Sequence, residues 1–334
     1  MTIKNLLSVK KFSRKAYSMI EMSLLILIIG ILFSGAYQGF NIYYETHLAS
    51  AKTLTQNSIV SRVKNLGFWY ESTHEESLEK NENYEGKNIS MWLDRNVQQL
   101  IKNNFYSAQK NDNKKFNYES TNIIDASGPK YISNGIGGLP SLNFKNTNSS
   151  SNFLAMDQNF KFGKDDVVFF AVVRFKNFET NAVIFDRICL KNSGASTSDE
   201  SLAINSCKPS FSAKINILGY PNLFIQNDDG SQLKSTENTS FKIKKDVPYI
   251  FTFERIFNKS IAIYYNGKLI SSTEENLGEI NFLPLKIGRG ATDLNVNSEF
   301  DLSELIMIYG KWKNEHKIEI ENYLAKKYSI KIER

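Results

Sequence analysis

Residues 22–40 form an uncharged, strongly apolar segment close to the start of this chain of 334 residues. As an α-helix these nineteen residues would extend for ~28 Å, which matches the hydrocarbon thickness of a bilayer. A single carboxylate, Glu21, stands directly before the segment. An ionisable group at the end of an apolar helix is costly in a membrane unless it has a partner, so it indicates a function. We therefore predict a membrane-spanning helix over residues 19–40 with a specific role for Glu21.

The residues before this helix are basic. Residues 1–16 contain no acidic side chain, and their basic side chains are Lys4, Lys10, Lys11, Arg14 and Lys15. Because basic flanks stay on the cytoplasmic side of a membrane, we expect the rest of the chain in the periplasm or outside the cell. Without these five residues the remaining 36 Lys and Arg face 35 Asp and Glu, so the net charge of +6 gives no indication of nucleic-acid binding.

The order of these features resembles the N-terminus of type IV prepilins and of the pseudopilins of type II secretion systems. In those families a basic leader is followed by a small residue, an aromatic residue, a Glu four positions later and an apolar helix. The resemblance implies cleavage between Ala16 and Tyr17 by a prepilin peptidase, which also methylates the new α-amino group. Glu21 would then pair with the terminal ammonium of its own or a neighbouring subunit during assembly with other pilin or pseudopilin subunits.

Two other interpretations of the apolar segment remain open. A secretory signal would be cut after the segment, for which the small residues Ser34, Gly35 and Ala36 provide a site. A plain membrane anchor needs no cleavage, but it leaves Glu21 unexplained.

Apolar periodicity continues beyond the membrane segment, from Phe40 to Leu66, at steps of three or four with one step of five. The pattern predicts one helix from Ser18 to Leu66 that ends at Gly67, apolar in its first half and amphipathic in its second. Residues 71–90 contain six Glu and few apolar side chains. We therefore predict an acidic, solvated linker over residues 67–88.

From about residue 89 the chain has the pattern of a β-sandwich, with short β-rich segments between Asn, Ser, Gly and Lys turns. Asn266-Gly267 predicts a type I′ hairpin turn. The expected strands are Asp166–Phe175, Ala182–Asp186, Lys214–Leu218, Leu223–Gln226, Val247–Arg255, Ile261–Tyr265, Lys268–Ser272, Leu283–Ile287 and Leu302–Tyr309. A final helix is expected over Glu315–Tyr328, with Asn314 as its N-cap. The fold class is therefore α+β.

Several segments in this part resemble concanavalin A-like jelly rolls of the laminin G type. They are Ser90–Asp94, Asn134–Phe144, Ile263–Lys268, Leu285–Gly288 and Ser303–Tyr309. The resemblance implies a jelly-roll domain over residues 89–334 that binds a glycan or a surface protein.

We expect no enzymatic activity, but one string in this region keeps a glycan hydrolase open as an alternative. Glu299, Asp301 and Glu304 follow the E-x-D-x-x-E pattern that glucanases carry on the same scaffold, where a retaining mechanism needs two carboxyl groups about 5 Å apart. In a regular strand Glu299 and Asp301 share one face and Glu304 faces the other, so a β-bulge is required. Glu304 also fits the position where the laminin G-type pattern has a Glu before its last apolar strand.

Few other residues indicate chemistry. Cys189 and Cys207 are the only two cysteines, and an exported domain permits a disulfide between them, with two free thiols as the alternative. Asn227-Asp228-Asp229-Gly230 is typical of a turn and is a weaker candidate for calcium. The three histidines are scattered, so we expect no metal site and no cofactor.

These observations predict a minor pilin-like or pseudopilin-like subunit of the bacterial inner membrane, cut at Ala16/Tyr17, whose jelly-roll head binds a protein or a glycan in the periplasm or on a filament. The head is large for a major subunit, which favours a minor one. Two alternatives are a membrane-anchored lectin-like protein that does not assemble and a tethered glycan hydrolase.

Overall fold

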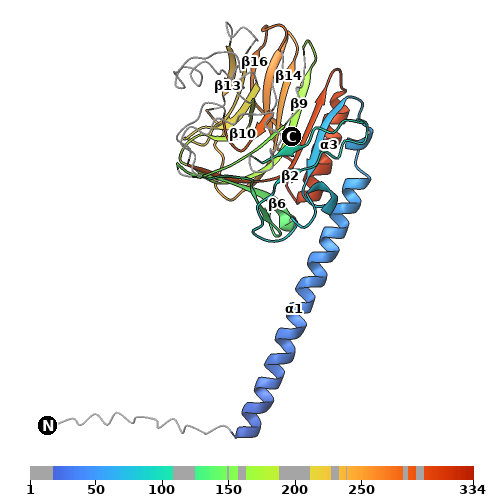
Figure 1. Cartoon of the computed structure of the whole chain (residues 1–334), viewed down its shortest axis with the longest axis vertical. Coiled ribbons are helices and arrows are strands. Elements are labelled where there is room, and N and C mark those ends of the chain that lie inside the picture. Colours follow the sequence, from blue (N-terminus) through green and yellow to red (C-terminus); the bar gives the residue numbers. More distant parts are fainter. Residues whose placement is uncertain are drawn as a thin grey trace, which may run out of the picture. The chain divides into compact units, whose positions relative to one another are not determined.

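The computed structural model describes residues 18–107, 125–148, 150–156, 163–187, 211–226, 233–237, 239–280, 285–290 and 297–334. The chain divides into two compact units, Met1–His47 and Leu48–Arg334. The described part of the first unit is helical, and the second unit, the head, is a β-sandwich with a C-terminal helix (Figure 1). The processing residues Ala16 and Tyr17, the cysteines Cys189 and Cys207, and the turn at residues 227–230 lie outside the described residues.

Helix α1 runs from Met19 to Gln56 without a break. It is long and apolar enough to cross a membrane, and the apolar side chains of its first half are exposed on all sides. The predicted extension to Leu66 is wrong. The helix ends where the apolar period slips by five residues, between Leu54 and Ile59, and a short 3₁₀ turn at Val60–Arg62 follows.

The head contains two sheets whose described strand pairs are antiparallel except β4 with β7. The first sheet, sheet A, consists of β1 Leu66–Glu71, β4 Asp125–Ser127, β5 Lys130–Ile132, β6 Ser141–Asn146, β7 Ser150–Asn152, β9 Val167–Phe178, β14 Pro248–Ile256, β15 Ser260–Tyr265, β16 Lys268–Glu274 and β18 Ser298–Tyr309. The second, sheet B, consists of β2 Met91–Trp92, β3 Phe105–Tyr106, β8 Leu154–Met156, β10 Ala182–Arg187, β11 Phe211–Ile215, β12 Pro221–Gln226, β13 Leu233–Glu237 and β17 Leu285–Ile287.

Strand β18 organises sheet A because it pairs with three other strands. It pairs along its length with β9, and along its other edge first with β6, through residues 298–302, and then with β1, through residues 304–308. The predicted linker over residues 67–88 is therefore wrong at its start, since β1 completes the sheet and is buried at every position. The run Leu66-Gly67-Phe68-Trp69-Tyr70 has the composition of a strand, and the acidic residues after it obscured this.

The main core lies between the two sheets and is rich in phenylalanine. Phe169 from β9 stacks on Phe185 from β10 with ring centroids 4.4 Å apart, and Phe211 from β11 lies 5.0 Å from Phe169. Strands of both sheets therefore meet through aromatic side chains that alternate with outward-facing residues.

A second apolar cluster lies on the outer face of sheet A, under helix α3 (Asn314–Tyr328). The buried side chains of α3 include Ile320, Leu324 and Tyr328, at the spacing of one helical face. They pack with Phe170 and Ile306 of the sheet, and Figure 1 shows α3 beside this sheet. The predicted N-cap shifts by one residue, because Lys313 holds the extended cap position and Asn314 is the first helical residue.

Other sequence expectations are confirmed in outline. Asn266 and Gly267 have φ angles of 46° and 84°, as a type I′ turn requires, and they join β15 to β16. Most predicted strands match within a few residues. The expected strand Lys214–Leu218 begins and ends earlier, at Phe211–Ile215, because residues 216–220 form a hairpin turn.

Gly137 lies where the 3₁₀ turn Ile136–Gly138 contacts the end of α3, so its substitution tests this contact. Its φ angle is +62°, and an added Cβ would lie 2.5 Å from the carbonyl oxygen of Tyr328. Gly278 has a φ angle of +76° with no atom within 4 Å of such a Cβ. Both alanine substitutions carry backbone strain, so we expect Gly137→Ala to reduce the free energy of unfolding by about 1–2 kcal/mol more than Gly278→Ala. Urea denaturation followed by tryptophan fluorescence measures this, since all three tryptophans lie in the head; equal losses would contradict it.

Candidate functional site

A β-bulge at Ser303 determines where the acidic residues of β18 point. The register with β9 shifts between Leu302 and Glu304. Before the bulge Phe300 and Leu302 face the core between the sheets, and after it Leu305 does so. The bulge that the sequence pattern required is therefore present, and it places Glu299, Asp301 and Glu304 on the same outer face of sheet A.

The outer face is partly open to solvent around Glu299, whereas Asp301 is buried beneath its partners. Arg174 from β9 donates to Asp301 Oδ2 through Nε at 3.0 Å and Nη2 at 2.6 Å. Asn143 from β6 donates its amide to Asp301 Oδ1 at 2.8 Å and to Glu299 Oε1 at 3.2 Å. Lys176 lies 3.0 Å from Asp301, and Lys145 lies 3.4 Å from Glu299. We call these six residues the open polar patch.

Beyond the bulge the outer face is covered, and Glu304 is fully buried there. Its Oε1 accepts hydrogen bonds from Trp69 Nε1 at 2.7 Å and from the Tyr323 hydroxyl at 2.8 Å. Its Oε2 accepts from Lys327 Nζ at 2.8 Å and from the Tyr328 hydroxyl at 2.9 Å. Four donors therefore surround this carboxylate.

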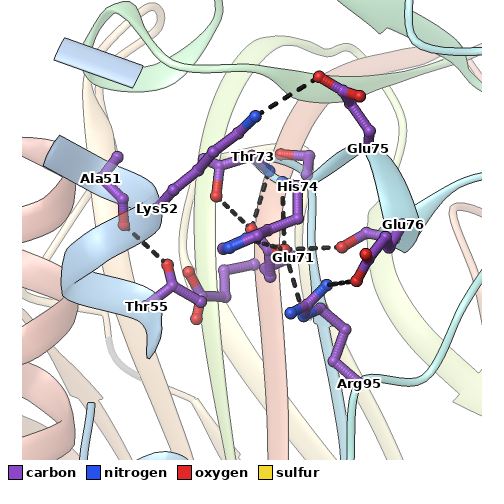
Figure 2. A network of polar contacts seen from close by, with 12 residues as sticks. Ala51, Lys52, Thr55, Glu71, Thr73, His74, Glu75, Glu76 and Arg95 are labelled. Atoms are coloured by element: carbon purple, nitrogen blue, oxygen red, sulfur yellow. Dashed lines mark hydrogen bonds and ion pairs between the residues drawn. The ribbon is translucent and has the colours of Figure 1, made fainter. Parts of the chain in front are cut away.

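Lys327 links Glu304 to a second buried carboxylate, Glu71, at the end of β1. The Lys327 ammonium lies 3.3 Å from Glu71 Oε2, and both side chains are fully buried. The other Glu71 oxygen lies 2.8 Å from His74 Nδ1 and accepts a hydrogen bond from the Ser77 hydroxyl at 2.6 Å, with Arg95 Nε 3.6 Å away (Figure 2). We call Glu71, Glu304, Lys327 and their partners the buried ionic network.

The network reaches the last turns of α1. The Thr55 hydroxyl lies 3.2 Å from the Tyr323 hydroxyl and donates to the Ala51 carbonyl at 2.9 Å, a contact drawn in Figure 2. Ala51 and Thr55 are the buried residues of α1, one turn apart, and Lys52 pairs with Glu75 at 3.5 Å. The last turns of α1 therefore belong to the head.

The network changes the acidity of its members. Burial acts to raise the pKa of Glu71, but Lys327, His74 and Ser77 outweigh it and hold that pKa well below its usual range. Burial and the neighbouring Glu304 raise the pKa of the Tyr328 hydroxyl well above its usual value. At neutral pH Glu71 is therefore ionised and Tyr328 is protonated.

The predicted catalytic residues share a face but do not share an open cleft. Glu304 is enclosed by donors under α3, while Glu299 is partly exposed on the open polar patch. A sugar ring must reach both carboxyl groups of a retaining site, and the bonded, buried Glu304 does not permit this. Within the described residues no group of three His, Cys, Asp or Glu side chains is arranged to hold a metal ion.

Glu21 lies in the first turn of α1, where it forms a capping box with Ser18. The Glu21 carboxylate accepts a hydrogen bond from the Ser18 N–H at 2.9 Å, and the Ser18 hydroxyl accepts one from the Ile20 N–H at 3.3 Å. This S-x-x-E pattern was visible in the sequence and gives Glu21 a local role that the analysis of charge alone missed.

Neither Glu71 nor Lys327 was expected from the sequence to be a site residue. Glu71 was assigned to a solvated linker, and Lys327 is one of several lysines in an amphipathic helix. They are 256 positions apart, so no local pattern pairs them. The one signal in the sequence was the apolar run Leu66–Tyr70 directly before Glu71, which is typical of a buried strand.

No protein-family model matches this chain, and no curated protein matches its sequence. Solved structures with a similar arrangement include the receptor-binding domain of botulinum neurotoxin D, at 13% identity and a TM-score of 0.48, covering 78% of this chain and 53% of that one. The botulinum neurotoxin serotype D ligand-binding domain, in complex with N-acetylneuraminic acid, matches at 12% identity and 0.48, covering 77% and 50%. The binding domain of Paraclostridial Mosquitocidal Protein 1 matches at 13% and 0.42, covering 59% and 46%. This chain thus spans about half of each, and likeness at this level assigns it neither a family nor a ligand.

We predict that removing the cation of the buried ionic network strongly destabilises the head. Lys327→Met leaves two like charges buried without their shared partner, which should reduce the free energy of unfolding by about 3–5 kcal/mol. Adding Glu71→Gln and Glu304→Gln to that variant should recover part of the loss, since the uncompensated charges are gone. Urea denaturation measures both; a loss below about 1 kcal/mol for Lys327→Met would contradict the buried ion pair.

The dependence of the free energy of unfolding on pH in the acidic range provides a second test. The pKa of Glu71 is lower in the folded head than in the unfolded chain, where it is about 4.3. The free energy that ionised Glu71 contributes to stability is therefore complete above pH ~4.3 and is lost as the pH falls through the folded pKa. The free energy of unfolding of Glu71→Gln should therefore fall less steeply below pH ~4.3 than that of the unchanged protein. Parallel curves would show that Glu71 is not ionised in the folded head.

Proposed function

We propose that this chain is a pilin-like or pseudopilin-like minor subunit, anchored in the bacterial inner membrane by α1, whose concanavalin A-like head is displayed to bind a protein or a glycan. Cleavage at Ala16/Tyr17 by a prepilin peptidase, methylation of Tyr17 and assembly with other pilin or pseudopilin subunits belong to this proposal.

Helix α1 is the observation that carries the proposal. Its only charged group before Glu45 is Glu21, in the first turn, and the apolar side chains that follow are exposed around the whole helix. A helix that is apolar on every side requires lipid or other apolar helices as surroundings. The aromatic residues Tyr37, Phe40 and Tyr43 follow before Glu45, as expected where a helix leaves a bilayer.

The position of Glu21 supports the pairing that the proposal needs. Its carboxylate already lies at the backbone N–H of Ser18, the residue after Tyr17. Cleavage after Ala16 would create an ammonium group on Tyr17, the residue directly before Ser18. A carboxylate close to that ammonium neutralises both charges in an apolar setting, which gives stacked helices a defined register.

The open polar patch supports a binding role for the head. Arg174, Lys176 and Lys145 supply donors, Asn143 an amide, and Glu299 a partly exposed carboxylate on a rigid sheet. Convergent groups of these types form hydrogen bonds with sugar hydroxyl or carboxylate groups. The same patch supports the second candidate, a membrane-anchored lectin-like protein that does not assemble.

Two substitutions of Glu21 test the proposal and separate its two roles. Glu21→Gln keeps an acceptor for the Ser18 N–H but removes the charge, whereas Glu21→Ala removes both. We expect both variants to insert into the membrane and both to show about tenfold less subunit in the assembled, sedimentable fraction. Assembly of Glu21→Gln at the unchanged level would show that the charge is not needed and would contradict the proposed pairing. Absence of the unchanged protein from the assembled fraction would favour the lectin-like alternative.

A further inference from the structure

The strand register arranges the side chains of the open polar patch in rows across sheet A. One row runs from Lys130 of β5 through Asn143 of β6 and Asp301 of β18 to Arg174 of β9. Residues that oppose one another in paired strands point to the same face, so Lys130 lies beside the patch on the outer face. Neighbouring strands are ~4.8 Å apart, which makes this row ~14 Å long.

A second row lies next to the first. Lys145 of β6 opposes Glu299 of β18, which opposes Asn177 of β9. The register with β9 shifts directly after Glu299, so Lys176 is an extra residue there, and its ammonium lies 3.8 Å from Glu299 Oε1. Lys245, from the segment before β14, donates to Asn177 Oδ1 at 3.3 Å and extends this row by one more cation.

The two rows place cations at both sides and carboxylates in the middle. Their five basic side chains flank two carboxylates, Asp301 and Glu299, which both belong to β18. The Asp301 side chain has no exposed surface and that of Glu299 has 23%, whereas that of Lys145 has 60%. Two acidic residues at the margin, Glu179 and Asp246, leave the cations in excess. The groups that an incoming ligand meets are therefore mainly positive, with one carboxylate between them.

Asp301 holds two of these cations in position from below. It accepts hydrogen bonds from Arg174 Nε at 3.0 Å and Nη2 at 2.6 Å, and its other oxygen lies 3.0 Å from the Lys176 ammonium. Both basic side chains remain partly exposed. Among the described residues none bonds to Arg174 Nη1, which stays available to a ligand. Cations that are fixed before binding lose less entropy when a ligand arrives.

The mixed character of this surface selects the chemistry of its ligand. The cations require an anionic group, while Glu299, which as a carboxylate only accepts hydrogen bonds, requires a donor. A sugar acid supplies both, because its carboxylate pairs with ammonium or guanidinium groups and its hydroxyls donate. A neutral sugar leaves the cations without an anion, and an acidic peptide brings further carboxylates to Glu299, where like charges repel.

We propose that the open polar patch, together with Lys130 and Lys245, binds an oligosaccharide that carries carboxylate groups. Lys145, Lys176 and Nη1 of Arg174 pair with the sugar carboxylates, and Glu299 accepts a hydrogen bond from a sugar hydroxyl. This inference rests on the binding role proposed for the head and names the class of ligand.

Calorimetric titration of the full-length chain in detergent tests the proposal. The probes are tetrasaccharides of galacturonate, mannuronate and glucuronate, the same three with each carboxylate reduced to an alcohol, and tetraglutamate. The patch variant combines Lys145→Gln with Lys176→Gln. A second variant combines Lys130→Gln with Lys145→Gln, neither of which contacts the buried Asp301. The control is Lys164→Gln, since Lys164 is also an exposed lysine in an ion pair, with Glu279 at 3.2 Å, but lies before β9 and outside the patch.

We expect at least one acidic tetrasaccharide to bind, with affinity at least about tenfold lower for its reduced form and for both patch variants, because each change removes charge-assisted hydrogen bonds. Lys164→Gln should bind as the unchanged protein does. Affinity should fall as salt is added, since the contacts are ionic and partly exposed. Tryptophan fluorescence checks that each variant is folded.

The contrary results differ from one another. Equal binding of the acidic and reduced tetrasaccharides would overturn the inference and leave a glycan-binding head intact. Binding of tetraglutamate as tight as that of the acidic sugars would overturn it in favour of an acidic protein partner. If none of the probes binds, the inference is wrong, while the subunit role is decided separately by the sedimentation of the Glu21 variants.

Discussion

The ammonium of Lys327, shared by Glu304 and Glu71, is the interaction on which the arrangement of the head depends. One cation from α3 lies 2.8 Å from a carboxylate of β18 and 3.3 Å from a carboxylate of β1, with all three side chains buried. Buried charges are tolerated only when each is compensated, so the three elements must come together at once. Through Tyr323 and Thr55 the same network includes the last turn of α1. The end of the helix and the sandwich are therefore one structural unit.

This network also explains why an acidic motif typical of glucanases does not produce an open catalytic cleft. The bulge at Ser303 brings Glu304 to the face that holds Glu299 and Asp301. Helix α3 then covers the half of that face beyond the bulge, and its tyrosines and lysine occupy both oxygens of Glu304. What remains open is a patch of paired cations and carboxylates before the bulge. The same strand thus provides a structural carboxylate at one end and part of a partly exposed polar patch at the other.

Local signals in the sequence predicted local structure well. The Asn266-Gly267 turn, the alternating strand Val247–Arg255 and the uncharged helix behind Glu21 were all visible, because each depends on residues a few positions apart. The same reasoning extended α1 to Leu66 and placed Glu71 in a solvated linker. The first error overlooked a local signal, the slip of five residues between Leu54 and Ile59. The second concerns a place where distant partners decide: β1 pairs with the edge of β18, and Glu71 is buried against Lys327 of the last helix.

Mass spectrometry of the N-terminus of the membrane-inserted protein tests the account most directly, because the pairing of Glu21 and assembly both depend on the same cleavage. The account predicts a mature chain that begins at Tyr17 with a methylated α-amino group. A chain that keeps Met1 and the basic residues up to Lys15, or one that begins after residue 34, would contradict it.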